Sequence, residues 1–280
     1  MIDMTGRELA QDIKDNIAKE IKKGQLDLSL SVILVGNNPA SEKYVEFKRR
    51  ACEEVGIRYK LWRFPETATP SEVLSLIKKL NADEQVTGII VQLPLPKNFV
   101  SDELLEAIDP AKDVDGLNSV NLGRLTKYLP GLYPATAEGV INLLRYYKID
   151  LAGKRVVVVG QSNLVGRPLA QFLLNDHATV MMANSMTKDL AELTRNSDII
   201  VTAVGKAKLI TADMVPKGAV VVDVGTSLYE GKIVGDVDYE SVSKVASHLT
   251  PCVGGVGPLT VAFLLSNVLK AAINDFGVHR

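Results

Sequence analysis

Residues 155–174 read RVVVVGQSNLVGRPLAQFLL, and this stretch decides the fold class of the second half of the chain. Arg155 is followed by four valines that end at Gly160. An unbroken run of β-branched residues is typical of a strand that is covered on both faces of a parallel sheet. Residues 168–174 are expected to lie in the helix that follows. A strand, a glycine-containing turn and a helix in this order predict an α/β domain.

The alternation of strands and helices extends over the whole chain. We expect strands at 29–35, 57–64, 86–91, 155–159, 178–183, 198–204 and 219–224, and helices at 3–23, 41–55, 71–81, 102–108, 138–147 and 259–273. Residues 109–137 show little periodicity and are expected to form a long irregular segment, which is a usual place for function. The sequence therefore predicts two α/β lobes beside a cleft, with ligand sites beyond the carboxyl ends of the strands.

The composition narrows the class of protein. The 280 residues include 32 basic and 33 acidic residues, and the net charge of −1 gives no sign of a nucleic-acid partner. Two cysteines and three scattered histidines suggest neither a disulfide framework nor a metal site. The polar N-terminus does not resemble a secretory signal, and no apolar run approaches the length of a membrane-spanning helix. We therefore expect a cytoplasmic protein without a nucleic-acid or membrane partner.

Lys48 is the most informative single residue in the first half of the chain. With Ser41 as the N-cap of a helix at 41–55, the helical period places Lys48 on an apolar face. The same face carries Tyr44, Ala51, Cys52 and Val55. Burial disfavours the charged form of an amine, so an inward lysine is a candidate for acid/base work. The alternative is a lysine with a buried stem and an amine that reaches solvent or a structural partner.

The turn from Gly160 to Pro168 partly follows the dinucleotide-binding pattern G-x-G-x-x-G. Ser162 occupies the second glycine position, and the last glycine is displaced by one residue to Gly166. Such a turn by itself is equally compatible with a tight strand–helix connection. The strong strand before it and the helix N-terminus after it, which can hold a phosphate, favour nucleotide binding.

The end of the next predicted strand bears on the choice of nicotinamide cofactor. An NAD site usually has a carboxylate there, which bonds the 2′-hydroxyl of the ribose. Residues 183–188, ANSMTK, contain no carboxylate, and this favours NADP. Ser185 can donate a hydrogen bond, whereas Lys188 and Arg167 are more simply interpreted as solvated loop residues.

Two polar motifs in the first half are candidates for ligand contacts. QLPLP at 92–96 directly follows a strand, and its prolines aim Gln92 at the carboxyl end of that strand. The Gln92 amide can bond a lysine or a substrate there, and a rigid turn is the alternative. DVDG at 113–116 ends in Asp-Gly, which in isolation indicates an ordinary turn.

Five motifs occur in one order along the chain. They are Tyr44-Val45-x-x-Lys48, QLPLP at 92–96, DVDG at 113–116, the Gly160–Pro168 turn and GGVGP at 254–258. Together they resemble the bifunctional methylenetetrahydrofolate dehydrogenase/methenyltetrahydrofolate cyclohydrolase family, and the resemblance covers essentially the whole chain.

This resemblance implies a folate-binding catalytic domain at 1–137, completed by a C-terminal helix at 258–280, and a Rossmann-type NADP-binding domain at 138–257. It implies an enzyme that oxidises 5,10-methylenetetrahydrofolate with NADP and hydrolyses the resulting 5,10-methenyl cation to 10-formyltetrahydrofolate. It further implies a homodimer, tetrahydrofolate derivatives as small-molecule partners, and a place in one-carbon metabolism and purine biosynthesis.

The resemblance also assigns roles to residues. Lys48 matches the catalytic lysine, Gln92 a residue that orients and tunes this lysine, and Asp115 the anchor of the pterin. Tyr44, the third member of the catalytic set, is expected to lay its ring on the substrate. The other expected substrate residues are Gly254, Gly255 and Pro258, and the expected cofactor residues are Gly160, Gln161, Ser162, Val165, Gly166, Ser185 and Thr226.

Several positions depart from the family pattern. Gln161 stands where an arginine for the 2′-phosphate is usual and Asn184 where a histidine is usual, so NAD is an alternative cofactor. The other departures, which border the expected site, are Ala135, Ala137, Cys252 and Val253. Two other interpretations stay open: a different nicotinamide dehydrogenase of similar form, such as a shikimate-type enzyme, and a non-catalytic relative that binds folate or nucleotide.

Overall fold

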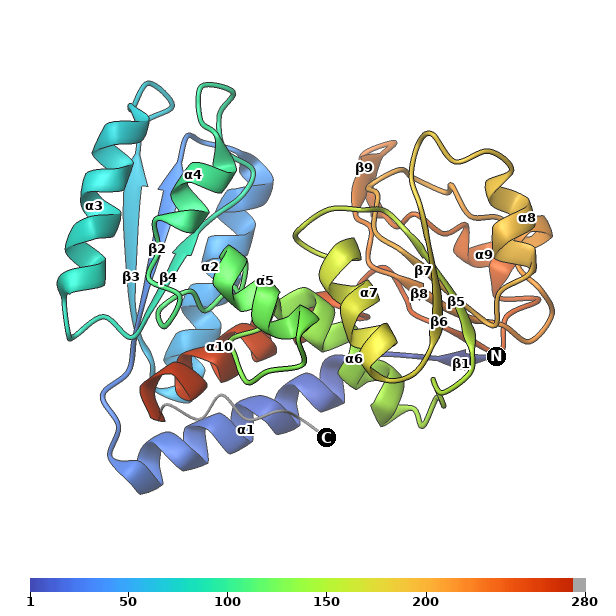
Figure 1. Cartoon of the computed structure of the whole chain (residues 1–280), viewed down its shortest axis with the longest axis horizontal. Helices are drawn as coiled ribbons and strands as arrows, with labels where there is room; N and C mark the ends of the chain where they lie inside the picture. Colours follow the sequence, from blue (N-terminus) through green and yellow to red (C-terminus); the bar gives the residue numbers. More distant parts are fainter. Residues whose placement is uncertain (274–280) are drawn as a thin grey trace. The chain divides into compact units, whose positions relative to one another are not determined.

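The structure, a computed structural model, describes residues 1–273 and contains two compact units, both of the expected α/β class (Figure 1). Unit 1 consists of Met1–Ala10 and Thr136–Thr260, and unit 2 consists of Gln11–Ala135 and the chain from Val261 onward. The first ten residues therefore differ from the expected division. They belong to unit 1 because β1 (Ile2–Asp3) pairs in parallel with β11 (His248–Leu249). Residues 274–280 of the expected C-terminal helix lie outside the described residues.

Unit 2 is built on a three-stranded parallel sheet with the order β3-β2-β4. Its strands are β2 (Ser29–Val35), β3 (Arg58–Phe64) and β4 (Gly88–Val91). Its helices are α1 (Arg7–Gly24), α2 (Pro39–Val55), α3 (Pro70–Ala82), α4 (Ser101–Glu106), α5 (Ser119–Thr126) and α10 (Gly257–Ile273). Helices α1 and α10 each begin in unit 1 and continue in unit 2. Every residue of the central strand β2 is buried. Ile33 of β2 shares a core with Ile77 of α3 and Leu104 of α4, so helices cover this apolar strand.

Three segments among the elements of unit 2 differ from the sequence-based expectation. Helix α1 begins at Arg7, not at residue 3, because residues 2 and 3 form the strand β1. Helix α2 begins at Pro39, not after Ser41, because the side-chain oxygen of Asn38 accepts hydrogen bonds from two backbone N–H groups of the first turn. The segment 109–137, expected to be irregular, contains α5, which Asn118 caps in the same way. A helix of only 8 residues gives too short a periodic signal to be recognised.

Unit 1 is built on a six-stranded parallel sheet with the order β1-β11-β8-β7-β5-β6. Its longer strands are β5 (Arg155–Val159), β6 (Thr179–Ala183), β7 (Ile199–Thr202) and β8 (Val220–Asp223), and its helices are α6 (Ala135–Tyr146), α7 (Gly166–Asn175), α8 (Leu190–Arg195) and α9 (Tyr239–Val242), with a 3₁₀ helix η1 (Ala212–Met214). The valines of β5 are buried, as expected for a strand with neighbours on both sides. The strand order reverses at β5, and this reversal marks the ligand-binding edge of a Rossmann-type sheet.

Unit 1 also contains short elements that we did not expect from the sequence. They are α8, α9, η1, the two-residue strands β1 and β11, and the antiparallel hairpin of β9 (Ser227–Tyr229) and β10 (Lys232–Val234). The longest of these, α8, has 6 residues, which is fewer than two full turns of a periodic pattern.

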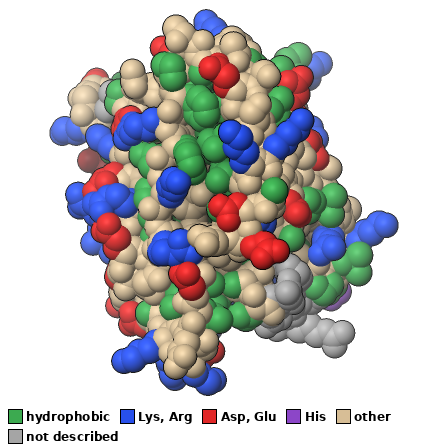
Figure 2. All heavy atoms as spheres, turned by 90° about the vertical axis from the view of Figure 1, so that its left-hand side faces the viewer, with side chains coloured by type: hydrophobic (Ala, Val, Ile, Leu, Met, Phe, Trp, Pro, Cys, Tyr) green, Lys and Arg blue, Asp and Glu red, His purple; other side chains and the backbone are tan. Residues whose placement is uncertain are grey.

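On the face shown in Figure 2, lysine and arginine side chains lie among aspartate and glutamate, and neither sign of charge dominates. Within residues 1–273, every helix falls short of the length or apolarity that a membrane span requires.

Candidate active site

Lys48 lies on the buried face of α2, with 7% of the residue exposed. Its Nζ donates a hydrogen bond of 2.8 Å to Oε1 of Gln92, which directly follows β4. The Gln92 amide is held in this orientation because its Nε2 donates to the carbonyl oxygen of Leu93 at 2.7 Å. Tyr44, one turn before Lys48, is 41% exposed and lies at the solvent edge of the same face. The structure therefore brings Lys48 and Gln92 into direct contact and leaves the Tyr44 ring accessible.

The charges of Lys48 and Asp115 influence each other. Burial lowers the pKa of Lys48 below the ordinary lysine value, and the Asp115 carboxylate and the Cys52 thiol oppose this shift. Burial raises the pKa of Asp115, and the positive charge of Lys48 lowers it. An amine with a depressed pKa, held by a neutral amide and close to a carboxylate, is suited to take up a proton.

Asp115 stands on a loop that Asp113 holds in place. The buried Asp113 carboxylate accepts hydrogen bonds from the backbone N–H groups of Gly116 and Asn118 at 3.1 and 2.8 Å. Burial raises the pKa of Asp113 to about 6. Gly116 has a φ of +72°, and a Cβ at this position would lie 2.3 Å from the carbonyl carbon of Tyr133. The DVDG motif is therefore a turn, fixed by Asp113 and Gly116, that supports Asp115.

The turn between β5 and α7 is very tight. Gly160 has a φ of +118°, and a Cβ there would lie 2.6 Å from the carbonyl oxygen of Ala203, in the loop after β7. A Cβ at Gly166 would lie 2.0 Å from the carbonyl oxygen of Gly160. Ser162, at the second glycine position, accepts a hydrogen bond from the N–H of Val165 and so closes the turn. These residues fit a dinucleotide, because they bring the N-terminus of α7 to the carboxyl end of the sheet.

The side chain of Gln161 reaches the end of β6, where dinucleotide-binding domains read the 2′ substituent of the ribose. Nδ2 of Asn184 donates a hydrogen bond of 3.1 Å to Oε1 of Gln161. Nε of Arg167 donates to the carbonyl oxygen of Gln161, also at 3.1 Å. Ser185, after β6, and Thr226, after β8, are exposed. The two departures from the family pattern, Gln161 and Asn184, therefore form one hydrogen-bonded pair.

Two buried carboxylates, which were not predicted from the sequence, hold the loops beside the turn between β5 and α7. Asp236 accepts hydrogen bonds from the hydroxyl of Thr202 and from the N–H groups of Val204 and Lys206, at 2.9, 2.8 and 2.7 Å. Asp223, the last residue of β8, accepts from three backbone N–H groups. Burial raises the pKa of Asp223 to about 7. A carboxylate directly after three valines at the end of a predicted strand was the signal available in the sequence.

Replacing Asp236 with asparagine should lower the free energy of unfolding by about 3 kcal/mol. The reason is that the NH₂ group of asparagine would replace a carboxylate oxygen that accepts a hydrogen bond, so that two donors would face each other. Urea unfolding measures the change. Asp238→Asn is the matched control, because Asp238 is partly exposed and its carboxylate forms a long ion pair of 3.8 Å with Lys208. We expect it to stay within about 0.5 kcal/mol of the native chain. Equal stability of Asp236→Asn and the native chain would show that the Asp236 carboxylate does not hold these loops.

The remaining expected substrate residues, Gly254, Gly255 and Pro258, belong to unit 1, whereas Lys48 and its neighbours belong to unit 2. Gly254 has a φ of +90°, and its carbonyl oxygen accepts hydrogen bonds from the N–H of Gly6 at 2.9 Å and from the Thr5 hydroxyl. A Cβ at Gly255 would lie 2.4 Å from the carbonyl oxygen of Pro251. The backbone geometry of this loop thus requires glycine at positions 254 and 255.

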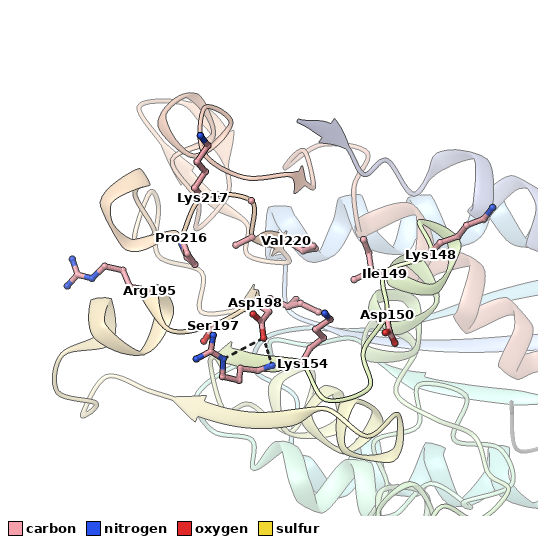
Figure 3. Close-up of a pocket in the computed structure, with 14 residues that line it drawn as sticks. Lys148, Ile149, Asp150, Lys154, Arg195, Ser197, Asp198, Pro216, Lys217 and Val220 are labelled. Carbon is pink, nitrogen blue, oxygen red and sulfur yellow. Dashed lines mark hydrogen bonds and ion pairs between the residues drawn. The ribbon is translucent and has the colours of Figure 1, made fainter.

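A pocket of about 430 Å³ lies at the amino ends of the unit 1 strands, whereas the turn after β5 lies at their carboxyl ends (Figure 3). It is lined by residues at the amino ends of β5, β7 and β8, where Asp198 accepts a hydrogen bond of 2.8 Å from the N–H of Arg155. In Figure 3 the charged ends of Lys148, Arg195 and Lys217 extend away from it. Ligands of parallel α/β sheets bind beyond the carboxyl ends of strands, so this pocket is not part of the candidate site.

Comparison with known proteins places both units in one family. The family model described as "Tetrahydrofolate dehydrogenase/cyclohydrolase, catalytic domain" matches residues 4–115, and that described as "Tetrahydrofolate dehydrogenase/cyclohydrolase, NAD(P)-binding domain" matches residues 134–276. The "Bifunctional protein FolD" of Nautilia profundicola is 49% identical over 275 residues, which cover 97% of each chain.

Solved structures agree with this match. The bifunctional FolD enzyme of Campylobacter jejuni aligns with a TM-score of 0.95 and 48% identity over 98% of this chain and 99% of that chain. The FolD enzyme of Trypanosoma brucei, solved with NADP cofactor and an inhibitor, aligns with a TM-score of 0.93 and 35% identity over 98% of each chain. The match extends over both units, which argues against a dehydrogenase that is similar in its nucleotide-binding lobe alone. The chain belongs to the tetrahydrofolate dehydrogenase/cyclohydrolase family.

Proposed function

We propose that this chain oxidises 5,10-methylenetetrahydrofolate to the 5,10-methenyl cation with NADP, and that it hydrolyses this cation to 10-formyltetrahydrofolate. The single observation that carries the proposal is the buried contact between Lys48 and Gln92, within electrostatic reach of Asp115. A buried lysine with a depressed pKa suits a reaction that needs a base, and family membership supplies the substrate class.

In the hydrolysis, Lys48 is the proposed general base. Its neutral amine takes a proton from water as the water oxygen bonds to the methenyl carbon, and the bond from that carbon to N5 then breaks. The proton returns to N5, and the hydroxyl group of the intermediate releases its own proton to solvent as its oxygen becomes the carbonyl oxygen, which leaves the formyl group on N10. Gln92 is the positioning residue: its Oε1 accepts from Nζ and fixes the amine, and its own bond to Leu93 fixes the amide.

Asp115 is the proposed anchor of the pterin. An ionised carboxylate can accept two hydrogen bonds from the amino-pyrimidine edge. Burial raises the pKa of Asp115, and the positive charge of Lys48 opposes this shift. Tyr44, exposed at the edge of the Lys48 face, is placed to lay its ring on the substrate. The carboxylate thus sets the orientation of the pterin and the lysine acts at the one-carbon bridge.

In the oxidation, unit 1 is the proposed cofactor domain. Bound NADP supplies the acceptor for the hydride that leaves the methylene carbon. Gly160, Ser162 and Gly166 give the tight turn that lets a pyrophosphate approach the N-terminus of α7. Val165, Ser185 and Thr226 are proposed to border the nucleotide, together with Gln161.

A spectrophotometric assay with 5,10-methylenetetrahydrofolate, run in parallel with NADP and NAD, tests the proposal. We expect reduction of NADP and formation of 10-formyltetrahydrofolate. Folate binding without turnover would indicate a non-catalytic relative, and reduction with shikimate in place of folate would indicate a different dehydrogenase. Either outcome would contradict the proposed function.

Replacing Gln161 with arginine should tighten NADP binding by about tenfold and leave NAD binding nearly unchanged. The reason is that the new guanidinium adds a charged contact to a 2′-phosphate that NAD lacks. Titration calorimetry with both cofactors measures the two dissociation constants. Gln161→Met is the control, because it removes the hydrogen bond from Asn184 without adding charge. Equal effects of the arginine on both cofactors would show that position 161 does not face the 2′-phosphate.

The proposal extends to the setting of the enzyme. A homodimer and a role in supplying one-carbon units for purine biosynthesis are proposed from the resemblance of the five sequence motifs, and a cytoplasmic location is proposed from the composition. The balanced charge of the sequence and its lack of a long apolar run support the location.

A further inference from the structure

We infer that Asn267, on the C-terminal helix α10, is a positioning residue for the substrate-binding carboxylate of Asp115. The inference rests on the proposed function, because it gives Asn267 a task only if Asp115 holds the pterin. Neither the motifs of the sequence nor the departures from the family pattern draw attention to this asparagine.

The fully buried side-chain amide of Asn267 makes a pair of hydrogen bonds. Nδ2 of Asn267 donates to the carbonyl oxygen of Val114 at 2.9 Å and to that of Tyr133 at 2.8 Å. Val114 directly precedes Asp115. Both partners are carbonyl oxygens, which accept only, so the amide has to present its NH₂ group to them.

The two carbonyls belong to segments that already pack against each other. A Cβ on Gly116 would lie 2.3 Å from the carbonyl carbon of Tyr133. Asp113 bonds the N–H of Gly116 from the other side. Asp115 therefore has one neighbour, Val114, fixed by Asn267, and the other, Gly116, fixed by Asp113. Asn267 is the link that fastens this loop to helix α10.

The side-chain oxygen of Asn267 is unfavourable for the stability of the fold. Oδ1 of Asn267 is buried and has no hydrogen-bond partner among residues 1–273, and such an orphan acceptor is normally unfavourable. The neighbouring helix residues Leu264, Leu265 and Val268 are buried and apolar. Leucine, which is branched at Cγ like asparagine, would avoid the cost but would lose the hydrogen bonds to both carbonyl oxygens. The amide is thus explained by what it does for the loop, not by the packing of the helix.

Asn267→Leu tests the inference in the full-length enzyme. Loss of both bonds frees the loop, so the KM for 5,10-methylenetetrahydrofolate should rise by about tenfold or more. The KM for NADP should stay within about twofold, because the proposed cofactor residues belong to unit 1. If Asn267 only stabilised the fold, its replacement would change the KM values for the folate and for NADP together, or would change neither.

Val268→Ala is the matched control, because Val268 lies next to Asn267, is fully buried and makes no hydrogen bond to the loop. It should lower the unfolding temperature and leave both KM values near native. If Asn267→Leu does not fold, Asn267→Ser carries the test: one hydroxyl donor remains, and a smaller rise in the folate KM alone is expected.

Two outcomes would overturn the inference. One is a folded Asn267 variant with a native folate KM, and the other is a rise of the folate KM in Val268→Ala equal to that in the Asn267 variants. Failure of the proposed function itself is seen separately, because the native chain in the same assay would then show no folate turnover.

Discussion

Replacing Lys48 with methionine should lower the hydrolysis of 5,10-methenyltetrahydrofolate by about a thousandfold while the chain still folds. Methionine keeps the apolar stem on the buried face of α2 and removes only the amine that accepts the proton. The rate is followed from the loss of the absorbance of the methenyl cation. Folate binding, measured in parallel by fluorescence, should be retained within about tenfold, which separates loss of the base from loss of the substrate.

The control for this change is Lys43→Met, because Lys43 is an exposed residue of the same helix. It should hydrolyse the cation at the native rate. Native hydrolysis by Lys48→Met would remove Lys48 from the mechanism, and Gln92 would then be left without a functional partner.

Replacing Asp115 with asparagine should raise the dissociation constant for 5,10-methylenetetrahydrofolate by about thirtyfold or more. The amide presents a donor where the pterin edge also donates, so at least one charge-assisted bond is lost. Fluorescence titration with the folate measures the constant. Asp102→Asn, at an exposed position in the first turn of α4, should bind the folate normally.

The same variant should change the pH dependence of hydrolysis. The neutral Lys48 amine is the reactive form, so the native rate should rise with pH and level off below the ordinary lysine pKa of 10.5. The Asp115 carboxylate raises the pKa of Lys48, and its removal lets burial lower this pKa further. The rising limb of Asp115→Asn should therefore lie at lower pH than that of the native enzyme. Unchanged folate binding together with an unchanged limb would exclude Asp115 from the site.

Local sequence patterns were sufficient wherever one element decides the outcome. The four valines before Gly160 predict a buried parallel strand, and the helical period predicts that Lys48 points inward; the structure has both. The start of α2 was misplaced because the N-cap was assigned to Ser41, although Asn38 with Pro39 after it is the stronger signal.

Other features depend on contacts between distant segments. The N-terminal strand belongs to unit 1 because Ile2 and Asp3 pair with His248 and Leu249, more than 240 residues further along the chain. In the sequence nothing distinguishes Asp236 from other acidic residues. Its structural role is seen only in the folded chain, where its carboxylate accepts hydrogen bonds from Thr202, at the end of β7, and from Val204, in the loop that follows. A periodic pattern carries no information about partners so far along the chain.

The sequence by itself determined the α/β class, the direction of the Lys48 side chain and the tight turn after β5, because period and backbone sterics act within a few residues. Tertiary structure decided the partners: Lys48 meets Gln92 across 44 residues and Asn267 meets Val114 across 153. A helix fixes the direction of a side chain relative to its own axis, but only packing against other elements brings a particular acceptor within hydrogen-bond distance.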